Sequence, residues 1–430
     1  MVSIADPKWG AGIKIAFRFF FIFLALQILT ESFLGNLVGF SIDIWSIGAN
    51  IFTPPCLWLN RHLFHFHYTP ASWTIFSESL HTIRDIVYLV FTVAGCIIWT
   101  LADGKRPDYN RLHYWFSRVL VTGLSCIMFA YGIIKIFPIQ MAMPSVVTLG
   151  RKVGTLSPFD LLWATLGYGT PYEIFTGIVE VSGAILILFR RTRLAGLLII
   201  LSALLNIILL NYTYQIGVLV ISSYILLITL FLLAPNARSL TRLLFNGKAA
   251  RPYREPYVPE RNGKTVGFRV FMALLIASSF FLNTRWAYQR YTRRAALTRS
   301  RQYSLIREHI VGNDTLLMIE NDTLRWRLWS ESTVEGKRML SIVSMDPGVY
   351  KTYTLGRDSV GQILTLHPSG KKDTVAVRFH CTEVSGKDWR LDGTIGGSRV
   401  QLRLQRIDPD TAFRLLQTRR RVIVFDDEPE

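Results

Sequence analysis

Charged residues are scarce in this sequence. Asp, Glu, Lys and Arg make up 18% of its 430 residues, below the quarter that is usual in soluble proteins. Hydrophobic residues make up 50%, and the mean hydropathy is +0.30, so the chain holds more apolar material than one aqueous core takes up. The composition excludes a disordered, collagen-like or coiled-coil protein and argues against a soluble enzyme.

Cysteine is scarce as well. The four cysteines are Cys56, Cys96, Cys126 and Cys381, and none forms the CxxC pair of a thioredoxin-like enzyme. A redox enzyme that works through its own cysteine pair is therefore not expected. A disulfide between Cys56 and Cys381 stays open as an alternative, because both would lie outside the cytoplasm in the topology predicted below.

Long apolar runs, in contrast, are abundant. Seven segments of about 16–20 residues approach the length that crosses a hydrocarbon core, where only helices satisfy their own backbone. The first segment carries Lys14 and Arg18 and has no small-residue cleavage site after a short core, which predicts a retained helix and not a signal peptide. The predicted spans are Ile13–Thr30, Ile83–Leu101, Val119–Phe137, Tyr172–Phe189, Leu194–Leu210, Gly217–Leu233 and Phe268–Asn283.

Basic residues in the loops predict the orientation of these spans. One set of alternate loops holds 18 lysines and arginines and the other holds four. By the positive-inside rule, the N-terminus lies in the cytoplasm and the region after the seventh span lies in the periplasm, as in a multi-pass protein of a bacterial inner membrane. The net charge of +18 then reflects contact with the lipid bilayer, and no nucleic acid is expected, because no zinc-finger or RNA-binding motif accompanies it.

Segments outside the predicted spans differ in character. Glu31–Thr82, rich in aromatic residues, is expected to form interfacial helices or a cap, and Pro138–Thr170 is expected to contain a short helix at Phe159–Leu166. Asn236–Thr265 is rich in Pro and Arg, which predicts an extended cytoplasmic linker. Arg285–Arg301 is expected to form a helical stalk after the last span.

Hydrophobic alternation replaces the long apolar runs past about Ser304. Turn signals such as Asp346-Pro-Gly and Gly396-Gly397 separate about eight short runs. This pattern predicts a C-terminal all-β antiparallel barrel or sandwich. The runs are Leu316–Ile319, Leu324–Trp329, Met339–Val343, Tyr350–Leu355, Ile363–Leu366, Val375–Phe379, Trp389–Leu391 and Val400–Leu404.

Three histidines, His62, His65 and His67, lie close together in the first exterior segment. Their spacings of three and two residues can bring imidazoles toward one metal ion. The favoured interpretation is an aromatic-rich interfacial helix whose histidines face lipid headgroups, because no carboxylate or cysteine lies close by in sequence. Metal binding at this cluster remains the alternative.

Two charged residues lie inside predicted spans. Lys135 lies near the outer end of the third span and Glu180 lies well inside the fourth. A charge at bilayer depth costs at least ~2.5 kcal/mol on insertion scales, so each should pair or face a cavity. Their opposite signs make an ion pair plausible, while extension of Lys135 to the outer interface is the alternative.

Polar residues also gather at the end of the fifth span. Asn206, Asn211, Tyr214 and Gln215 lie there, although Asn206 and Asn211, about one and a half turns apart, need not share a face. One interpretation is hydrogen bonding between helices. The other is a polar pocket, open to the exterior, for a lipid headgroup or a quinone carbonyl.

Together these residues carry a family resemblance. Arg118–Lys135, ending in Tyr-Gly-Ile-Ile-Lys, followed by Gly177–Gly196 and by Asn211–Tyr214, resembles the DoxX-like membrane superfamily, a four-helix bundle, over about Arg118–Pro235. The whole chain resembles a larger, Bacteroidetes-type subgroup with a C-terminal extension of lipocalin-like aspect. Lys135 and Glu180 match the superfamily's membrane lysine and glutamate, and Arg190-Arg191-Thr192 matches its basic turn.

The predicted fold is thus a mainly α membrane protein of about seven transmembrane helices, with a DoxX-like four-helix core, plus the β domain. The expected divisions are 1–117 (N-terminal spans with an exterior cap), 118–235 (four-helix core), 236–303 (linker, last span and stalk) and 304–430 (β domain).

Two functions follow from the resemblance and the residues. Members of the superfamily are associated with thiosulfate:quinone oxidoreduction and with membrane-bound redox-defence complexes. This implies a redox-linked subunit that binds quinone or lipid near Tyr131, Lys135, Glu180 and 211–215, with Lys135 polarising a carbonyl and Glu180 holding or relaying a proton. The alternative is a non-enzymatic anchor or assembly protein that presents a periplasmic, lipocalin-like β domain to envelope protein partners, since His309, His367 and His380 are scattered and suggest no catalytic group.

Overall fold

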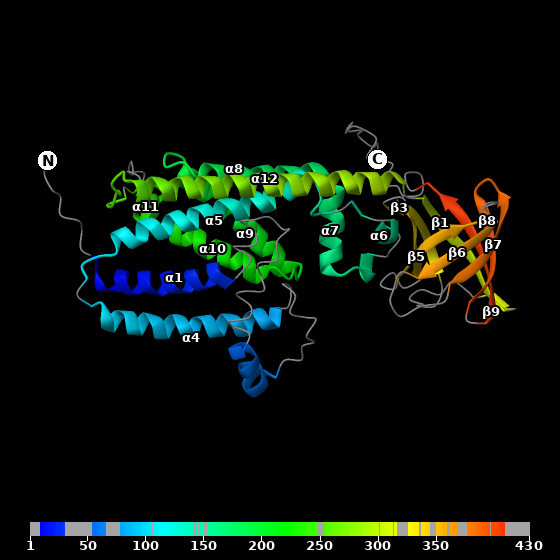
Figure 1. The fold of residues 1–430 in the computed structure, drawn as a ribbon, viewed down its shortest axis with the longest axis horizontal. Coiled ribbons are helices and arrows are strands. Elements are labelled where there is room, and N and C mark those ends of the chain that lie inside the picture. The colour runs from blue at the N-terminus through cyan, green and yellow to red at the C-terminus, as the bar shows by residue number, and fades with distance from the viewer. Residues whose placement is uncertain are drawn as a thin grey trace, which may run out of the picture. The chain divides into compact units, whose positions relative to one another are not determined.

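The computed structural model divides the chain into two compact units (Figure 1). One comprises Met1–Met141 and Pro158–Gln289, the other Ala142–Ser157 and Arg290–Glu430. The structure describes residues 9–30, 54–65, 78–104, 106–141, 143–144, 146–149, 153–246, 253, 255–300, 302–312, 314–315, 326–334, 337–344, 350–358, 362–368, 376–395 and 397–408.

Long helices dominate the first unit, because its apolar runs satisfy their backbone groups within themselves. The principal helices are α1 (Ala11–Thr30), α4 (Glu78–Ala102), α5 (Asn110–Ile136), α7 (Pro158–Tyr168), α8 (Thr170–Leu186), α9 (Arg193–Thr213), α10 (Leu219–Leu233), α11 (Ala237–Asn246) and α12 (Gly263–Ser300), which runs on into the second unit. Shorter helical pieces of this unit are η1 (Asn60–Phe64) and η4 (Ala234–Asn236), while α6 (Val146–Leu149) and η3 (Val153–Thr155) belong to the second unit.

Six helical stretches in the described part of the chain are long and apolar enough to cross a membrane. They are Ala11–Ile28, Ile83–Ala102, Asn110–Ile136, Arg193–Thr213, Leu219–Leu243 and Gly263–Ala295. They match six of the seven predicted spans and confirm a protein with several membrane-spanning helices. The remaining predicted span corresponds to α8, which has 17 residues and is therefore about 25 Å long. It is the shortest of the seven matching segments, and it carries Glu173 and Glu180.

The centre of this unit is α5, which packs against α8 and α10. Most of its residues are buried, including Leu120, Leu124 and Met128. The approach of α8 depends on two glycines. A Cβ atom on Gly177 would lie 2.6 Å from the carbonyl oxygen of Gly132, and one on Gly132 would lie 2.8 Å from the carbonyl oxygen of Gly177. Only glycine lets the two backbones come this close.

A buried arginine joins the first two long helices, which lie side by side (Figure 1). Arg18 of α1 donates to the Tyr109 hydroxyl at 2.7 and 3.0 Å, to Thr100 Oγ1 at 2.9 Å and to the carbonyl oxygen of Asp103 at 2.8 Å. Its guanidinium is thus satisfied by four acceptor contacts although only 2% of the residue is exposed.

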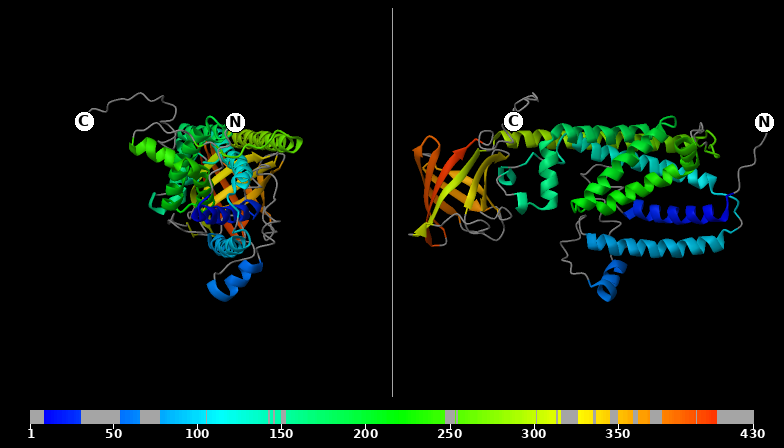
Figure 2. Two further views of the ribbon diagram at one scale, coloured as in Figure 1. Left: turned by 90° about the vertical axis from the view of Figure 1, so that its left-hand side faces the viewer. Right: turned by 180° about the vertical axis from the view of Figure 1, so that it is seen from behind.

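The C-terminal unit contains a closed antiparallel barrel. Its strands follow one another as a meander, and β1 also pairs with β9, so the sheet has no open side (Figure 2). This observation selects the barrel over the sandwich. The strands are β1 (Gln302–Val311), the two-residue β2 (Asp314–Thr315), β3 (Trp326–Val334), β4 (Lys337–Ser344), β5 (Tyr350–Arg357), β6 (Ile363–Pro368), β7 (Val377–Ser385), β8 (Asp388–Ile395) and β9 (Ser398–Ile407).

Alternate residues of these strands fill the barrel. Trp329 and Phe379 are 2% and 1% exposed, and they pack with leucines of β4, β6, β8 and β9. Seven of the eight predicted runs correspond to the strands β3 to β9. Burial alternates along β5, β6, β7 and β9, whereas in β3 the neighbouring residues Leu328 and Trp329 are both buried. The first predicted run, Leu316–Ile319, lies outside the described residues, while β1 is a strand that the pattern does not predict. Its register shifts between Ile306 and Glu308, which breaks the alternation along the sequence.

Candidate functional site

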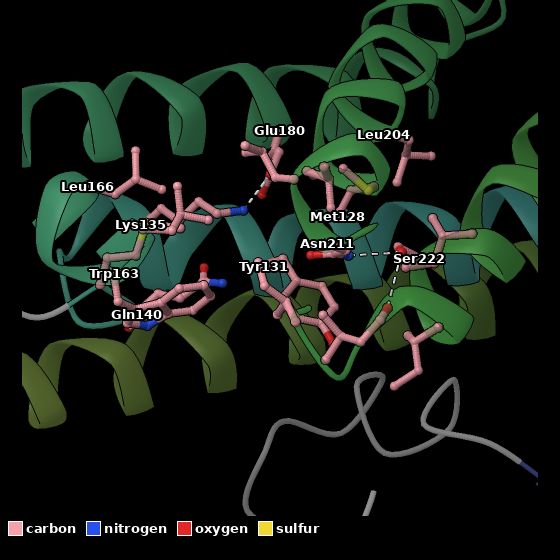
Figure 3. Close-up of a pocket in the computed structure, with 18 residues that line it drawn as sticks. Met128, Tyr131, Lys135, Gln140, Trp163, Leu166, Glu180, Leu204, Asn211 and Ser222 are labelled. Atoms are coloured by element: carbon pink, nitrogen blue, oxygen red, sulfur yellow. Dashed lines mark hydrogen bonds and ion pairs between the residues drawn. The ribbon is translucent and has the colours of Figure 1, made fainter. Parts of the chain in front are cut away.

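Helices α5 and α8 bring the two predicted membrane charges together. Lys135 lies in the last turn of α5, and its Nζ donates to Glu180 Oε1 of α8 in a short ion pair (Figure 3). The side chains are only 7% and 3% exposed. The close approach at Gly177 puts the Cβ atom of Lys135 beside α8, so the pairing follows directly from how the helices pack. Extension of Lys135 to the interface is therefore not observed.

Glu180 is only half satisfied by this pair. Its second carboxylate oxygen, Oε2, is buried and has no hydrogen-bond partner among the described residues, and the same is true of the side-chain oxygen of Gln140. A buried acceptor without a donor costs free energy comparable to a lost hydrogen bond. Both oxygens are therefore available to a molecule that brings a hydroxyl or N–H group.

The pair borders a cavity of about 100 Å³, which we call the ion-pair cavity. Helices α5, α7, α8, α9 and α10 contribute its walls, and most of the lining side chains are aliphatic. Figure 3 shows Trp163 and Gln140 on one side of Lys135, with Met128 and Leu204 beyond Glu180. The arrangement combines an apolar enclosure with a few convergent polar groups, which is the usual composition of a small-molecule site.

Asn211 adds a second polar contact to the cavity wall. Its Nδ2 donates to Ser222 Oγ at 3.0 Å, and Ser222 lies within hydrogen-bond distance of the carbonyl oxygens of Val218 and Leu219, at 3.0 and 2.8 Å. Asn211 is 5% exposed. Asn211 thus both forms a hydrogen bond between α9 and α10 and lines the cavity, as the two interpretations of the sequence predicted separately.

Not every predicted site residue lies at the cavity. Tyr131 lines it together with Lys135, Glu180 and Asn211. Asn206 is exposed, because five residues of helix turn its side chain about 140° away from that of Asn211. Tyr214 and Gln215 are not among the lining residues; Gln215 adopts a left-handed backbone conformation, with φ of 53°, in the turn between α9 and α10.

Sequence reasoning missed the contribution of the segment after α5. Gln140 and Met141 line the cavity, and Trp163 of α7 does so too. The Trp163 indole donates to the carbonyl oxygen of Gln140 at 3.2 Å, and the backbone N–H of Met141 donates to Glu173 at 2.9 Å. Glu173 is 1% exposed. The signal in the sequence was Glu173 itself, a second carboxylate in the predicted fourth span, which needs a polar partner such as the Met141 N–H.

The histidine cluster gives no metal site among the described residues. His62 and His65 are exposed, and the described residues contain no group of three or more His, Cys, Asp or Glu side chains that could hold a metal ion. The His62 ring stacks on Trp58 at 4.8 Å, with Nδ1 2.9 Å from the Trp58 carbonyl oxygen. His67 lies outside the described residues.

The cysteines show no redox arrangement. All four are free and buried, so no disulfide joins Cys56 and Cys381. Burial, with a smaller effect of nearby Asp85, raises the pKa of the Cys56 thiol to about 11. Burial also raises the pKa of Cys381. Both thiols are thus protonated and weakly nucleophilic at neutral pH.

The fold and site define a multi-pass membrane protein with a small polar cavity in its helical bundle and an added β-barrel domain. None of the protein-family models matches the chain, and no solved structure matches it. Over 110 residues, 26% of this chain and 70% of the other, it is 33% identical to the uncharacterized protein YwoB of Bacillus subtilis (strain 168). The chain belongs to the same family as YwoB, whose name assigns no activity.

Proposed function

We propose that the ion-pair cavity binds the polar head of a quinone, or of another lipid-soluble molecule with a carbonyl or hydroxyl head, and that the protein is a redox-linked membrane subunit of the DoxX-like type. The observation that carries this proposal is the buried Lys135–Glu180 pair, whose free carboxylate oxygen borders an apolar cavity. A charge pair of this kind inside a membrane helix bundle is a marker of function.

Each polar group has a part in binding such a head. The Lys135 ammonium carries three N–H groups, so it donates to a quinone carbonyl while keeping Glu180. In the reduced molecule a hydroxyl donates to Glu180 Oε2 or to Gln140 Oε1, lining acceptors that have no partner among the described residues. A 150 Å³ cavity holds a benzene ring, so 100 Å³ takes the polar edge of a quinone ring while the rest of the ring and its tail extend beyond the cavity.

Glu180 gives the site a proton function. Reduction of a quinone to a quinol takes two electrons and two protons, and a carboxylate beside the carbonyl can hold one of those protons. The electrons would come from a redox partner in the membrane complex, which this proposal requires. The chain itself binds and orients the head, polarises its carbonyl through Lys135 and exchanges a proton at Glu180.

Fluorescence titration of the full-length protein in detergent micelles tests the proposal. A short-tailed menaquinone or ubiquinone analogue should quench the indole of Trp163, and Trp163→Phe should remove most of that quenching. Lys135→Met and Glu180→Gln should each weaken binding by about tenfold or more, the effect of losing a charged hydrogen-bond partner. Glu173→Gln alters a buried carboxylate of the same helix that does not line the cavity and keeps an oxygen acceptor for the Met141 N–H, so it should bind normally. Equal affinity in all variants would exclude this function.

The proposed setting is a bacterial inner membrane with the N-terminus in the cytoplasm and the barrel in the periplasm. The asymmetry of 18 basic residues against four in alternate loops supports it, provided that α8 crosses together with the six longer stretches. Fusions of alkaline phosphatase, which is active only outside the cytoplasm, test the orientation. A fusion after Ile407 should be active and one after Phe245 inactive.

The barrel favours a second candidate function, that of a non-enzymatic anchor that presents the domain to envelope proteins. Its interior is filled by large side chains such as Trp329 and Phe379, which leaves no room for the large ligand of an open barrel. A cavity of about 140 Å³ remains where β1 begins, and Glu331, Arg338 and Arg357 line it. Affinity capture with the full chain and with a chain ending at Ser300 separates the two functions: loss of all partners on truncation, with quinone binding retained, assigns partner recognition to the barrel.

A further inference from the structure

A second and more polar cavity lies at the other end of α5. It has a volume of about 350 Å³ and is lined by α5, α9, the turn between α8 and α9, the end of α10 with η4, and Tyr253, Glu255 and Val258. Ser117, which lines it, precedes Lys135 by 18 residues of the same helix, a rise of about 27 Å. This cavity is therefore separate from the ion-pair cavity, and nothing proposed above uses it. We call it the arginine cavity.

Three arginines from different elements meet one carboxylate at this cavity. Arg118 of α5 forms a short ion pair with Glu255, while Arg193 and Arg190 lie 3.4 and 3.6 Å from its carboxylate oxygens. The side chains of Arg118 and Arg193 are 17% and 18% exposed, and that of Arg190, at the cavity edge, is 56% exposed. All the ion pairs recorded for these arginines within the described residues go to Glu255.

The residues on both sides of Glu255 in the sequence make contacts of their own with other elements. The backbone N–H of Tyr253 donates to Asn236 Oδ1 at 3.0 Å. The ring of Tyr257 packs edge-on against the ring of Tyr114, with 5.6 Å between the ring centroids. The Arg118 guanidinium lies over the same Tyr114 ring, 4.7 Å from its centroid. Tyr253 and Tyr257, which lie two residues before and after Glu255, thus each contact another element of the unit.

The charges at this cavity do not balance. Three guanidinium groups against one carboxylate leave a net charge of +2, and two of the guanidiniums are mostly removed from water. Like charges crowded in a poorly solvated site repel one another, so a second anion is electrostatically favoured there. The cavity provides the space for that anion beside Glu255.

An unused hydrogen-bond donor points to the same conclusion independently of the charges. Ser117 lines the cavity, is 8% exposed, and its hydroxyl has no partner in the part of the chain that the structure describes. Its hydroxyl, with the N–H groups of Arg190 and Arg193, which also line the cavity, forms a set of donors that matches the oxygens of a phosphate group. Arginines that serve only to orient a membrane protein need neither burial nor convergence on one carboxylate.

We propose that the arginine cavity binds a phosphate group, with Arg190, Arg193 and Ser117 as donors and Glu255 as the carboxylate that opposes binding. The phosphate is either the phosphodiester of an anionic phospholipid headgroup or a free phosphate from the adjacent aqueous phase. The volume of 350 Å³ falls in the range of sites for small organic ligands, so a phosphate with an attached glycerol fits.

Native mass spectrometry of the full-length protein in detergent micelles tests this site with phosphatidylglycerol and phosphatidylcholine as probes. Wild-type protein should retain phosphatidylglycerol in preference to phosphatidylcholine. Arg193→Gln should weaken this retention by about tenfold or more, because a charged donor is lost, and Ser117→Ala should weaken it less. Arg191→Gln removes the same charge from an exposed residue of the same turn that does not line the cavity, and it should bind as wild type does.

Glu255→Gln makes the test independent of any loss of folding, because it should increase binding. Removing its charge raises the net charge of the cluster from +2 to +3, and phosphatidylglycerol should bind about fivefold more tightly or better. Calorimetric titration with inorganic phosphate at constant ionic strength identifies the source: binding that Arg193→Gln abolishes indicates a free phosphate, and retention of the lipid alone indicates a headgroup. The proposal is overturned if neither probe distinguishes wild type from Arg193→Gln, or if Arg191→Gln weakens binding equally.

Discussion

Replacing Lys135 by methionine should destabilise the helical unit severely, although methionine fits a membrane helix better than lysine does. The change keeps an unbranched side chain of similar length in the last turn of α5. It leaves Glu180, whose side chain is 3% exposed, as a buried carboxylate without a cation. The prediction therefore concerns the charge that stays behind and not the one that is removed.

The size of the effect follows from the burial of the pair. Breaking a buried ion pair by removing one partner costs about 3–5 kcal/mol, and a lone charge at the centre of a membrane helix costs about 2.5–3.5 kcal/mol on insertion scales. A loss of about 3 kcal/mol agrees with both ranges, and it raises the unfolding equilibrium constant by about a hundredfold. Replacing both residues by methionine removes the stranded charge and should recover most of the loss.

The measurement is a double-mutant cycle. Wild type, Lys135→Met, Glu180→Met and the double variant are unfolded in mixed micelles by increasing denaturing detergent, and helix content is followed by circular dichroism. Glu173→Gln, which retains an acceptor for the Met141 N–H, serves as a control and should lose less than about 1 kcal/mol. If the double variant loses as much as the two single variants combined, the residues are not coupled and the ion pair does not organise this unit.

Three further predictions concern other parts of the chain. Gly177→Ala should lower the free energy of unfolding by about 2 kcal/mol or more and weaken quinone binding, because its Cβ would lie 2.6 Å from a backbone oxygen of α5. Gly267→Ala, whose Cβ would meet nothing within 4 Å, should be neutral or slightly stabilising in the same detergent titration. Trp329→Ala should cost the barrel about 3–5 kcal/mol, measured as the loss or a large downward shift of one calorimetric transition; an unchanged transition would contradict the packing described. Cys381, whose pKa is raised by burial, should react with iodoacetamide more slowly than an unfolded control at pH 8. The unfolded thiol ionises first as pH rises, so the barrel should lose stability as pH moves from the unfolded toward the folded pKa, and equal alkylation rates would show that the thiol is not buried.

The sequence predicts the polar centre of the bundle better than its surroundings. Lys135 and Glu180 are conspicuous because each interrupts an apolar run, and opposite charges in a membrane have few ways to be satisfied. Gln140 and Trp163 carry no such signal, since both lie between α5 and α8, in a stretch where Glu173 accepts a hydrogen bond from the Met141 backbone. Residues that line a cavity from the chain between two long helices are identified only once that connection is placed.

The arginine cavity illustrates the same limit over a longer distance. The arginines are explained at once by the positive-inside rule, so the sequence offers no reason to look further. Glu255 lies 137 residues after Arg118, in a Pro-rich stretch whose composition predicts an extended linker and nothing about its partners. Periodicity predicts which elements form, whereas the pairing of an irregular segment with helix ends depends on the whole tertiary structure.

The seam between β1 and β9 has a consequence for how the second unit is made. Tyr303 pairs with Ile407 at one end of the seam and Val311 with Val400 at the other. The ring of strands can close only after synthesis has reached Ile407, long after the first strand has left the ribosome. Until then the edges of β1 and β8 are free to pair with other chains, and in a protein truncated before β9 both edges stay unpaired.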